Sequence, residues 1–137
     1  DVPLGFFDGF VFNSKDSEHK DEIDIKKGGI FIIVHGIRSL CLENKILNTN
    51  TPKRINKLIE LGMMEEELGK ELIMAFNFLT NLKLKSNLDK LDKNETMDNY
   101  INPNSLTTME KDLLKDSFKV INKLKKKLDF HFKLSYV

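Results

Sequence analysis

Apolar side chains recur every three or four residues over most of the chain, which is the spacing of amphipathic helices. The longest such stretch covers about residues 65–90, and two others cover about 25–44 and 107–130. The charged segment 14–22 and the segment 93–105 show no such period and are expected to be loops. The pattern therefore predicts three long helices.

Local signals support the ends of these helices. Asp24 is a suitable N-cap for the first helix, and Thr107 forms a capping box with Glu110 at the start of the last. The hydroxyl of Thr51, followed by Pro52, predicts a further short helix that ends at a glycine about ten residues later. Four helices are thus expected.

Three long helices and one short helix, joined by modest loops, favour an all-α, four-helix bundle. The segment 2–13 carries phenylalanines at even spacing and is expected to be a short extended arm ahead of the bundle. A length of 137 residues allows one domain, spanning 1–137. Because the chain begins at Asp1 rather than at a methionine, we expect it to be a fragment of a longer chain.

The composition narrows the class of protein. With 40% hydrophobic and 31% charged residues the chain is globular, and no apolar run has the roughly 18 residues of a membrane span. The net charge of +1 gives no argument for nucleic acid, and we interpret the lysines of the last helix as a solvated face, so no specific nucleic-acid binding is expected. A single cysteine and the absence of a signal peptide indicate a reducing, cytoplasmic location.

The sequence contains no pattern of a catalytic centre. It has no phosphate-binding loop, no Rossmann glycine fingerprint and no nucleophile elbow. His19, His35 and His131 lie far apart in sequence, so no metal site is predicted. Cys41 would lie on the opposite face of its helix from His35 and is interpreted as a core residue.

One polar cluster is a candidate anion site. At 100° per residue, the side chains of Lys27, His35 and Arg38 fall within roughly 80° of one another on the first helix. Two adjacent glycines weaken the first turn by about 1 kcal/mol each relative to alanine, which suggests close approach of another backbone or of a ligand. Cations beside a helix N-terminus suit phosphate. The candidate set is Lys26, Lys27, Gly28, Gly29, His35, Arg38 and Arg54. The alternative is a solvated edge with Arg38 paired to Glu43 or to a carboxylate of a neighbouring helix.

Several strings in this chain stand in the order of a known family. They are Pro-Leu-Gly-Phe-Phe at 3–7, Glu-His-Lys-Asp at 18–21, Ile-Asp-Ile-Lys-Lys-Gly-Gly-Ile-Phe at 23–31, Ile-Val-His-Gly-Ile-Arg at 33–38 and Asp-Asn-Tyr-Ile-Asn-Pro at 98–103. The whole chain resembles the substrate-binding domain of nucleotidyltransferases. This is a C-terminal helical domain of bacterial signal-transduction proteins that often also carry cyclic-nucleotide-binding, CBS and PII-uridylyltransferase-like modules. Ile32 departs from the family pattern, where proline is expected.

The resemblance implies a helical bundle attached to an N-terminal, polymerase-β-like nucleotidyltransferase domain in the same chain. The catalytic carboxylates of such enzymes lie in a Gly-Ser and Asp-x-Asp motif of that other domain, which nothing here matches. Mg²⁺ and a nucleoside triphosphate are therefore expected for the intact protein, and no cofactor for this domain. The implied function is to help bind the acceptor or the nucleotide for nucleoside-monophosphate transfer, with the polar cluster facing the shared cleft. The acceptor would be a nucleotide or a protein.

Two other functions remain open at this stage. The bundle could be a non-enzymatic regulatory or docking module of a signal-transduction protein, with the polar cluster as a contact between domains. A helical toxin of the RNase type would be expected to carry an Arg followed four to six residues later by a His, and neither Arg38 nor Arg54 is followed in this way.

Overall fold

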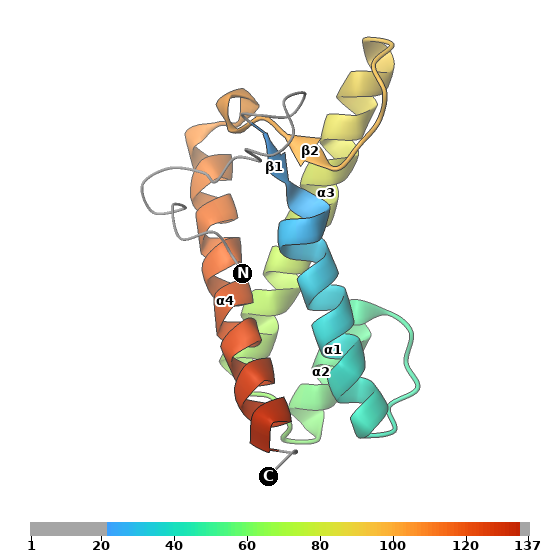
Figure 1. Cartoon of the computed structure of the whole chain (residues 1–137), viewed down its shortest axis with the longest axis vertical. Coiled ribbons are helices and arrows are strands. Elements are labelled where there is room, and N and C mark those ends of the chain that lie inside the picture. Colours follow the sequence, from blue (N-terminus) through green and yellow to red (C-terminus); the bar gives the residue numbers. More distant parts are fainter. Residues whose placement is uncertain (1–21, 135–137) are drawn as a thin grey trace.

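A computed structural model describes residues 22–134, and within them four α-helices form an elongated bundle with a two-stranded sheet at one end (Figure 1). The predicted all-α bundle is confirmed. The aromatic arm predicted in 2–13 lies outside the described residues. In chain order the elements are β1 (Ile23–Asp24), a π-helical turn (Lys26–Ile30), α1 (Phe31–Glu43), α2 (Thr51–Glu60), α3 (Glu66–Asp92), β2 (Tyr100–Ile101), a 3₁₀ turn (Pro103–Ser105) and α4 (Thr108–Leu134).

The helices pack as a ring in which α1 contacts α2 and α4, while α3 contacts α2 and α4. Because α2 has only 10 residues against 27 in α3 and in α4, it covers one half of the bundle. No helix among the described residues has the length and hydropathy needed to cross a membrane. Side chains from all four helices are fully buried, including Ile33, Ile37, Ile55, Leu58, Leu72, Leu79, Leu114, Ile121 and Leu124.

Two apolar positions that the helical period predicts to face the core do not: Met74 of α3 is 67% exposed, and Leu113 of α4 is also exposed. Leu113 is 44% exposed, whereas Val120, which the periodicity did not select, is 5% exposed. Leu113 and Val120 both line an outer groove between α3 and α4. The other positions of α4 that the period predicts to face the core are buried or half-buried; they are Leu114, Ser117, Phe118, Ile121, Leu124 and Leu128.

Two of the predicted helix caps are present. The Asp24 carboxylate accepts a hydrogen bond from the backbone N–H of Lys27 at 2.8 Å. The backbone N–H of Thr107 donates to Glu110 Oε1 at 2.9 Å, and the N–H of Glu110 donates to Thr107 Oγ1 at 3.1 Å. These bonds satisfy backbone donors that the first turn of a helix leaves without partners.

The cap predicted for α2 is wrong by one residue. Asn50, not Thr51, is the N-cap, and its side chain accepts from the N–H of Lys53 at 3.1 Å. Thr51 is the first helical residue and is buried. Both residue types are good caps, so the burial of Thr51 decides between them. As predicted, the helix stops before a glycine: Gly62 has a φ of +73°.

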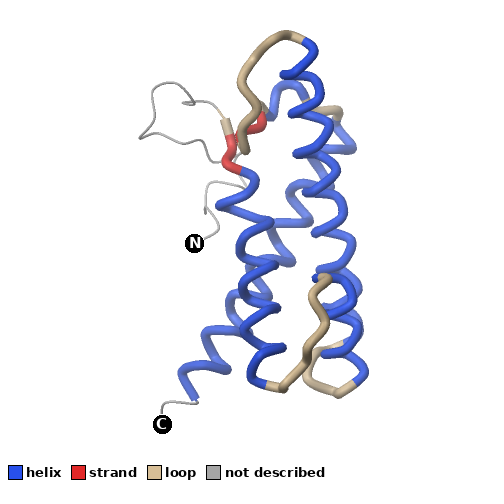
Figure 2. Tube along the Cα trace, turned by 90° about the vertical axis from the view of Figure 1, so that its right-hand side faces the viewer, coloured by secondary structure: helices blue, strands red, loops and turns tan. Residues whose placement is uncertain are grey.

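The sheet was not predicted. Ile23 pairs with Ile101 and Asp24 with Tyr100, in antiparallel orientation, at the end of the bundle where α3 turns back toward α4 (Figure 2). The N–H of Ile25 also donates to the carbonyl of Asn99 at 2.9 Å. Two-residue strands are too short to show a period of two, and the segments that pair lie far apart in sequence. This pairing fixes where the first helix begins.

Candidate functional site

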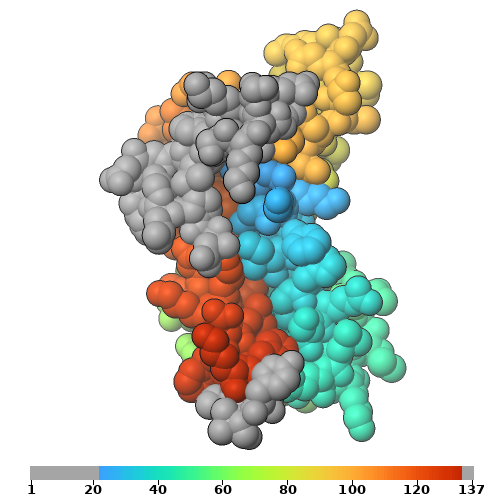
Figure 3. Space-filling model, viewed as in Figure 1, coloured from blue at the N-terminus to red at the C-terminus, as the bar shows by residue number. Residues whose placement is uncertain are grey.

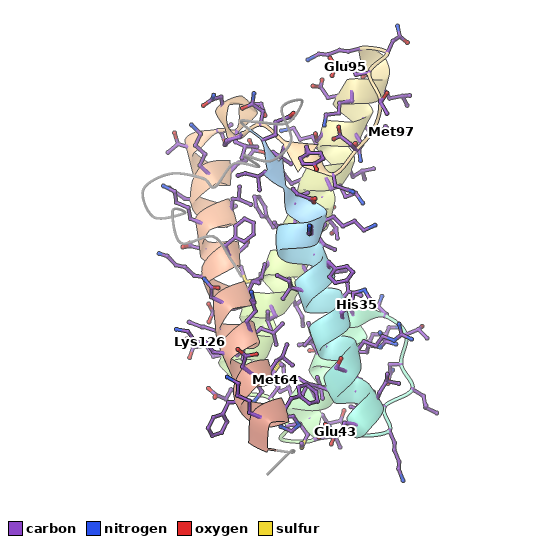
Figure 4. The ribbon with its side chains drawn as sticks, viewed as in Figure 1. His35, Glu43, Met64, Glu95, Met97 and Lys126 are labelled. Atoms are coloured by element: carbon purple, nitrogen blue, oxygen red, sulfur yellow. The ribbon has the colours of Figure 1, made fainter. Side chains whose placement is uncertain are left out.

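The outward face of the first helix carries both cations and aromatic surface. Phe31, His35, Arg38 and Leu42 are all exposed and follow one another at helical spacing, with Lys27 one turn ahead of Phe31. The rings of Phe31 and His35 lie with their centroids 3.9 Å apart and their planes at 32°. Figure 4 shows His35 on α1. A half-exposed aromatic ring paired with an imidazole offers a flat surface for another planar group.

A shallow groove of about 320 Å³ runs beside this face, between α1 and α4. Figure 3 shows the two helices side by side on this face of the molecule. The helices approach closely because Gly36 faces Leu128, and a Cβ at Gly36 would lie 2.6 Å from the Leu128 Cδ1 atom. The groove is lined by Phe31, Ile32, His35, Gly36 and Ser39 of α1 and by Lys125, Leu128, Asp129 and Phe132 of α4.

Lys26, Lys27, His35 and Arg38 are exposed but do not form one compact cluster. Lys26 and Lys27 lie in the π-helical turn, and His35 and Arg38 lie further along α1. Eleven residues separate Lys27 from Arg38, which is about 16 Å at the rise of an α-helix. The two side chains therefore lie spread along the face, which suits an extended ligand that follows the face from one to the other.

The two glycines of the predicted cluster face the core. Gly29 is buried, and a Cβ there would lie 3.0 Å from Leu79 Cδ1 of α3. Gly28 is half-buried, and its Cβ would lie 3.7 Å from the ring of Phe118. Among the described residues, the close approach inferred from the sequence is made by side chains of α3 and α4 rather than by another backbone. The glycines allow the first turn to pack tightly against the bundle.

Arg54 has a structural contact. It is half-buried on α2, and its Nε donates a hydrogen bond to the carbonyl of Asn48 in the connection between α1 and α2. Its own backbone carbonyl lies 3.9 Å from the sulfur of Cys41. The guanidinium therefore fastens the connection to α2.

Near the outward face of α1, some charged side chains form ion pairs and others do not. Within residues 22–134, Arg38 has no ion-pair partner, and the carboxylate of Glu43 contacts His131 instead. Cys41 is buried as predicted, and burial raises the pKa of its thiol against the opposing effect of the Arg54 charge. A raised pKa makes Cys41 a poor nucleophile.

The described residues do not fit a resident metal ion. Among them, no group of three or more His, Cys, Asp or Glu side chains lies close enough together to hold one. We therefore assign Mg²⁺ to none of these side chains.

Sequence reasoning found the α1 side of the groove in part and missed the rest. Phe31 was not among the candidate site residues, although its spacing of four from His35 places the two side chains on one face of the helix. No local sequence pattern indicates which face of α4 lies against α1. The groove residues of α4 could therefore not be predicted; they include Lys125, Asp129 and Phe132.

The sequence matches a known protein family. A family model described as "Putative nucleotidyltransferase substrate binding domain" matches residues 1–132. No similar curated protein and no similar solved structure was found.

Proposed function

The chain belongs to this family of nucleotidyltransferase substrate-binding domains, and from that premise we propose that its bundle holds the acceptor or the nucleotide for nucleoside-monophosphate transfer. A nucleotidyltransferase domain of the same intact protein supplies the catalysis. The bundle forms one wall of the shared cleft. The match over residues 1–132 is the observation that carries this proposal.

The outward face of α1 supports a nucleotide as the bound group. The paired rings of Phe31 and His35 provide a stacking surface for a base, and Lys27 and Arg38 flank it on the same face. Charge-assisted hydrogen bonds from Arg and Lys to phosphate oxygens are among the stronger polar contacts in proteins. The spacing of the two cations suits a base in the middle of the face with phosphates directed to one end.

Chemistry is assigned to the other domain. Phosphoryl and nucleotidyl transfer depends on positioned carboxylates that hold Mg²⁺ and neutralise the developing charge. Among the described residues, no three His, Cys, Asp or Glu side chains lie together in a group that could hold a metal ion. The part played by this chain is to bind and orient, which raises the rate by fixing the reacting groups relative to each other.

Binding can be tested on the chain itself. We would titrate it with a nucleoside triphosphate, with and without Mg²⁺, while following backbone amide shifts by NMR. Shifts concentrated at Phe31, His35 and Arg38 are expected. Arg38→Ala and Lys27→Ala should each weaken binding by about tenfold, the loss of one charge-assisted contact.

Lys126→Ala is the matched control. Lys126 is an exposed lysine of α4, on the side away from α1 in Figure 4, and its removal changes the net charge equally. Binding that falls as much in Lys126→Ala as in Arg38→Ala would mean that only the overall charge matters. If nucleotides cause no saturable shifts at residues of the α1 face, either in the chain or in the intact protein, the proposal is overturned.

A docking module without a nucleotide site is the second candidate. The end of α3 extends beyond the other helices (Figure 1), and there Leu84, Leu88 and Leu91 are each more than half exposed at helical spacing. An apolar stripe on an unpacked helix end is typical of protein contact. This candidate predicts that substitutions on the stripe disrupt partner binding while nucleotides have no effect.

A further inference from the structure

The outer groove between α3 and α4 exposes apolar surface on the side of the bundle away from α1. It has a volume of about 590 Å³ and an apolar floor that includes Ala75, Phe78 and Val120. Met74 is 67% exposed and Leu113 is 44% exposed at its walls. Large apolar side chains that gather in one exposed groove, rather than being scattered singly, mark an interaction surface.

The two walls of this groove carry opposite charges. Glu71 lies on the α3 wall, and Lys119 and Lys123 lie on the α4 wall. Asp116, the acidic residue of the α4 wall, is 3.9 Å from Lys119 of the same helix. Within residues 22–134, neither Glu71 nor Lys123 has an ion-pair partner. The α3 wall is therefore negative, and the α4 wall is positive on balance.

We propose that the occupant of this groove is a second copy of the chain, related by a two-fold axis parallel to the helices. Such an axis places α3 of each copy against α4 of the other. Because α3 and α4 run antiparallel (Figure 1), each pair across the interface is antiparallel as well. The same patch then serves both copies, as in most homodimers.

This symmetry pairs the charged walls favourably. Glu71 and Lys123 lie at the same level of the bundle, where both also line a second hollow between α3 and α4. Across the axis, Glu71 of one copy meets Lys123 of the other, and the contact occurs twice. Met74 of each copy packs on the apolar floor of the other groove. A partner whose surface carries charges of only one sign would be repelled by one of the two walls. A second copy of the chain, which offers both signs, is therefore the better complement.

The oligomeric state of the chain tests the proposal. Sedimentation velocity over a wide range of concentration should show a monomer–dimer equilibrium. Met74→Glu and Leu113→Glu should each raise the dissociation constant by tenfold or more, since they bury a charge in the apolar floor of the interface. Both side chains are exposed in the monomer, so circular dichroism should show an intact fold. Leu47→Glu is the control, because Leu47 is 88% exposed and lies outside the groove.

Charge exchange tests the symmetry itself. Glu71→Lys alone and Lys123→Glu alone should each weaken the dimer, because like charges then face each other twice. An equal mixture of the two variants should associate as a heterodimer, in which both contacts are again of opposite sign. A monomer at all concentrations, a dimer that tolerates Met74→Glu and Leu113→Glu, or a mixture that fails to associate would each overturn the proposal.

Discussion

Glu43 at the end of α1 and His131 near the end of α4 are joined through Oε1 and Nε2 at 2.7 Å, although 88 residues separate them. The contact ties the two helices together beyond the groove that holds Phe31 and His35. It also occupies the carboxylate that the sequence offered to Arg38. Arg38 is left on the outer face of α1, with no ion pair within residues 22–134.

Replacing Arg38 by alanine should hardly change stability. An exposed side chain without a partner contributes little, so the free energy of unfolding should fall by less than about 0.5 kcal/mol. Urea unfolding followed by circular dichroism measures this. A loss of 2 kcal/mol or more would mean that Arg38 has a structural role, and weaker nucleotide binding in the variant would then have a different explanation.

Alanine should have opposite effects at two glycines. At Gly69, a Cβ would lie 2.8 Å from Ile59 Cγ1 and 3.2 Å from Ile55 Cγ2, so side chains of α2 must shift. We expect Gly69→Ala to destabilise by about 1–2 kcal/mol, since overpacking outweighs the gain in helix propensity. At Gly28 the new Cβ makes an ordinary 3.7 Å contact with Phe118, and alanine should stabilise by about 0.5 kcal/mol. Thermal melts of both variants should shift in opposite directions.

Asp98 should be needed to hold the β1–β2 end of the bundle. Its carboxylate binds the largely buried Lys90 and accepts from the N–H of Tyr100 at 3.0 Å, while Lys90 also donates to the Tyr100 carbonyl at 2.8 Å. Asp98→Ala leaves Lys90 without its counter-ion and should cost about 2 kcal/mol. Asp89→Ala, which breaks an exposed pair with Lys93, should cost less than about 0.5 kcal/mol.

Hydrogen exchange gives the local readout of the Asp98 substitution. The N–H of Ile25 donates to the Asn99 carbonyl and should exchange faster in Asp98→Ala, with little change in Asp89→Ala. Equal acceleration at amides throughout the core would indicate global destabilisation rather than release of this end.

The capping box of Thr107 and Glu110 at the start of α4 should make the free energy of unfolding depend on pH in the acid range. The hydrogen bond from the Thr107 backbone N–H lowers the pKa of Glu110 from its ordinary value of 4.5. A lowered pKa stabilises the fold above pH 4.5, and this contribution is lost as the pH falls through the lowered pKa. Glu110→Gln accepts the same bond without titrating, so its stability should fall less on acidification. Denaturant midpoints of the native chain and of Glu110→Gln, measured from neutral to acid pH, test this. The same change of midpoint with pH in both proteins would contradict it.

Cys41 should be protected from thiol reagents in the folded chain. It is 1% exposed, and burial raises the pKa of its thiol, so little thiolate forms near neutral pH. Labelling should be slow in buffer and fast in denaturant, with the change at the unfolding midpoint. Rapid labelling of the native chain would show that the α1–α2 contact opens locally.

Much of the fold follows from the sequence because helices are encoded locally. The periods of α3 and α4 and the box of Thr107 with Glu110 each involve residues no more than four apart, so neighbours in sequence suffice to predict them. The same rule placed Lys27, His35 and Arg38 on one exposed face of the first helix.

The tertiary structure alone decided which faces meet. It paired β1 with β2, turned Gly29 toward Leu79, engaged Arg54 at the α1–α2 connection, and brought α4 beside Phe31 to complete the groove. These contacts join segments remote in sequence and arise because apolar faces from different helices are buried together, which no local period specifies. The helices and their charged faces were thus set by the sequence, and their arrangement into a site was set by packing.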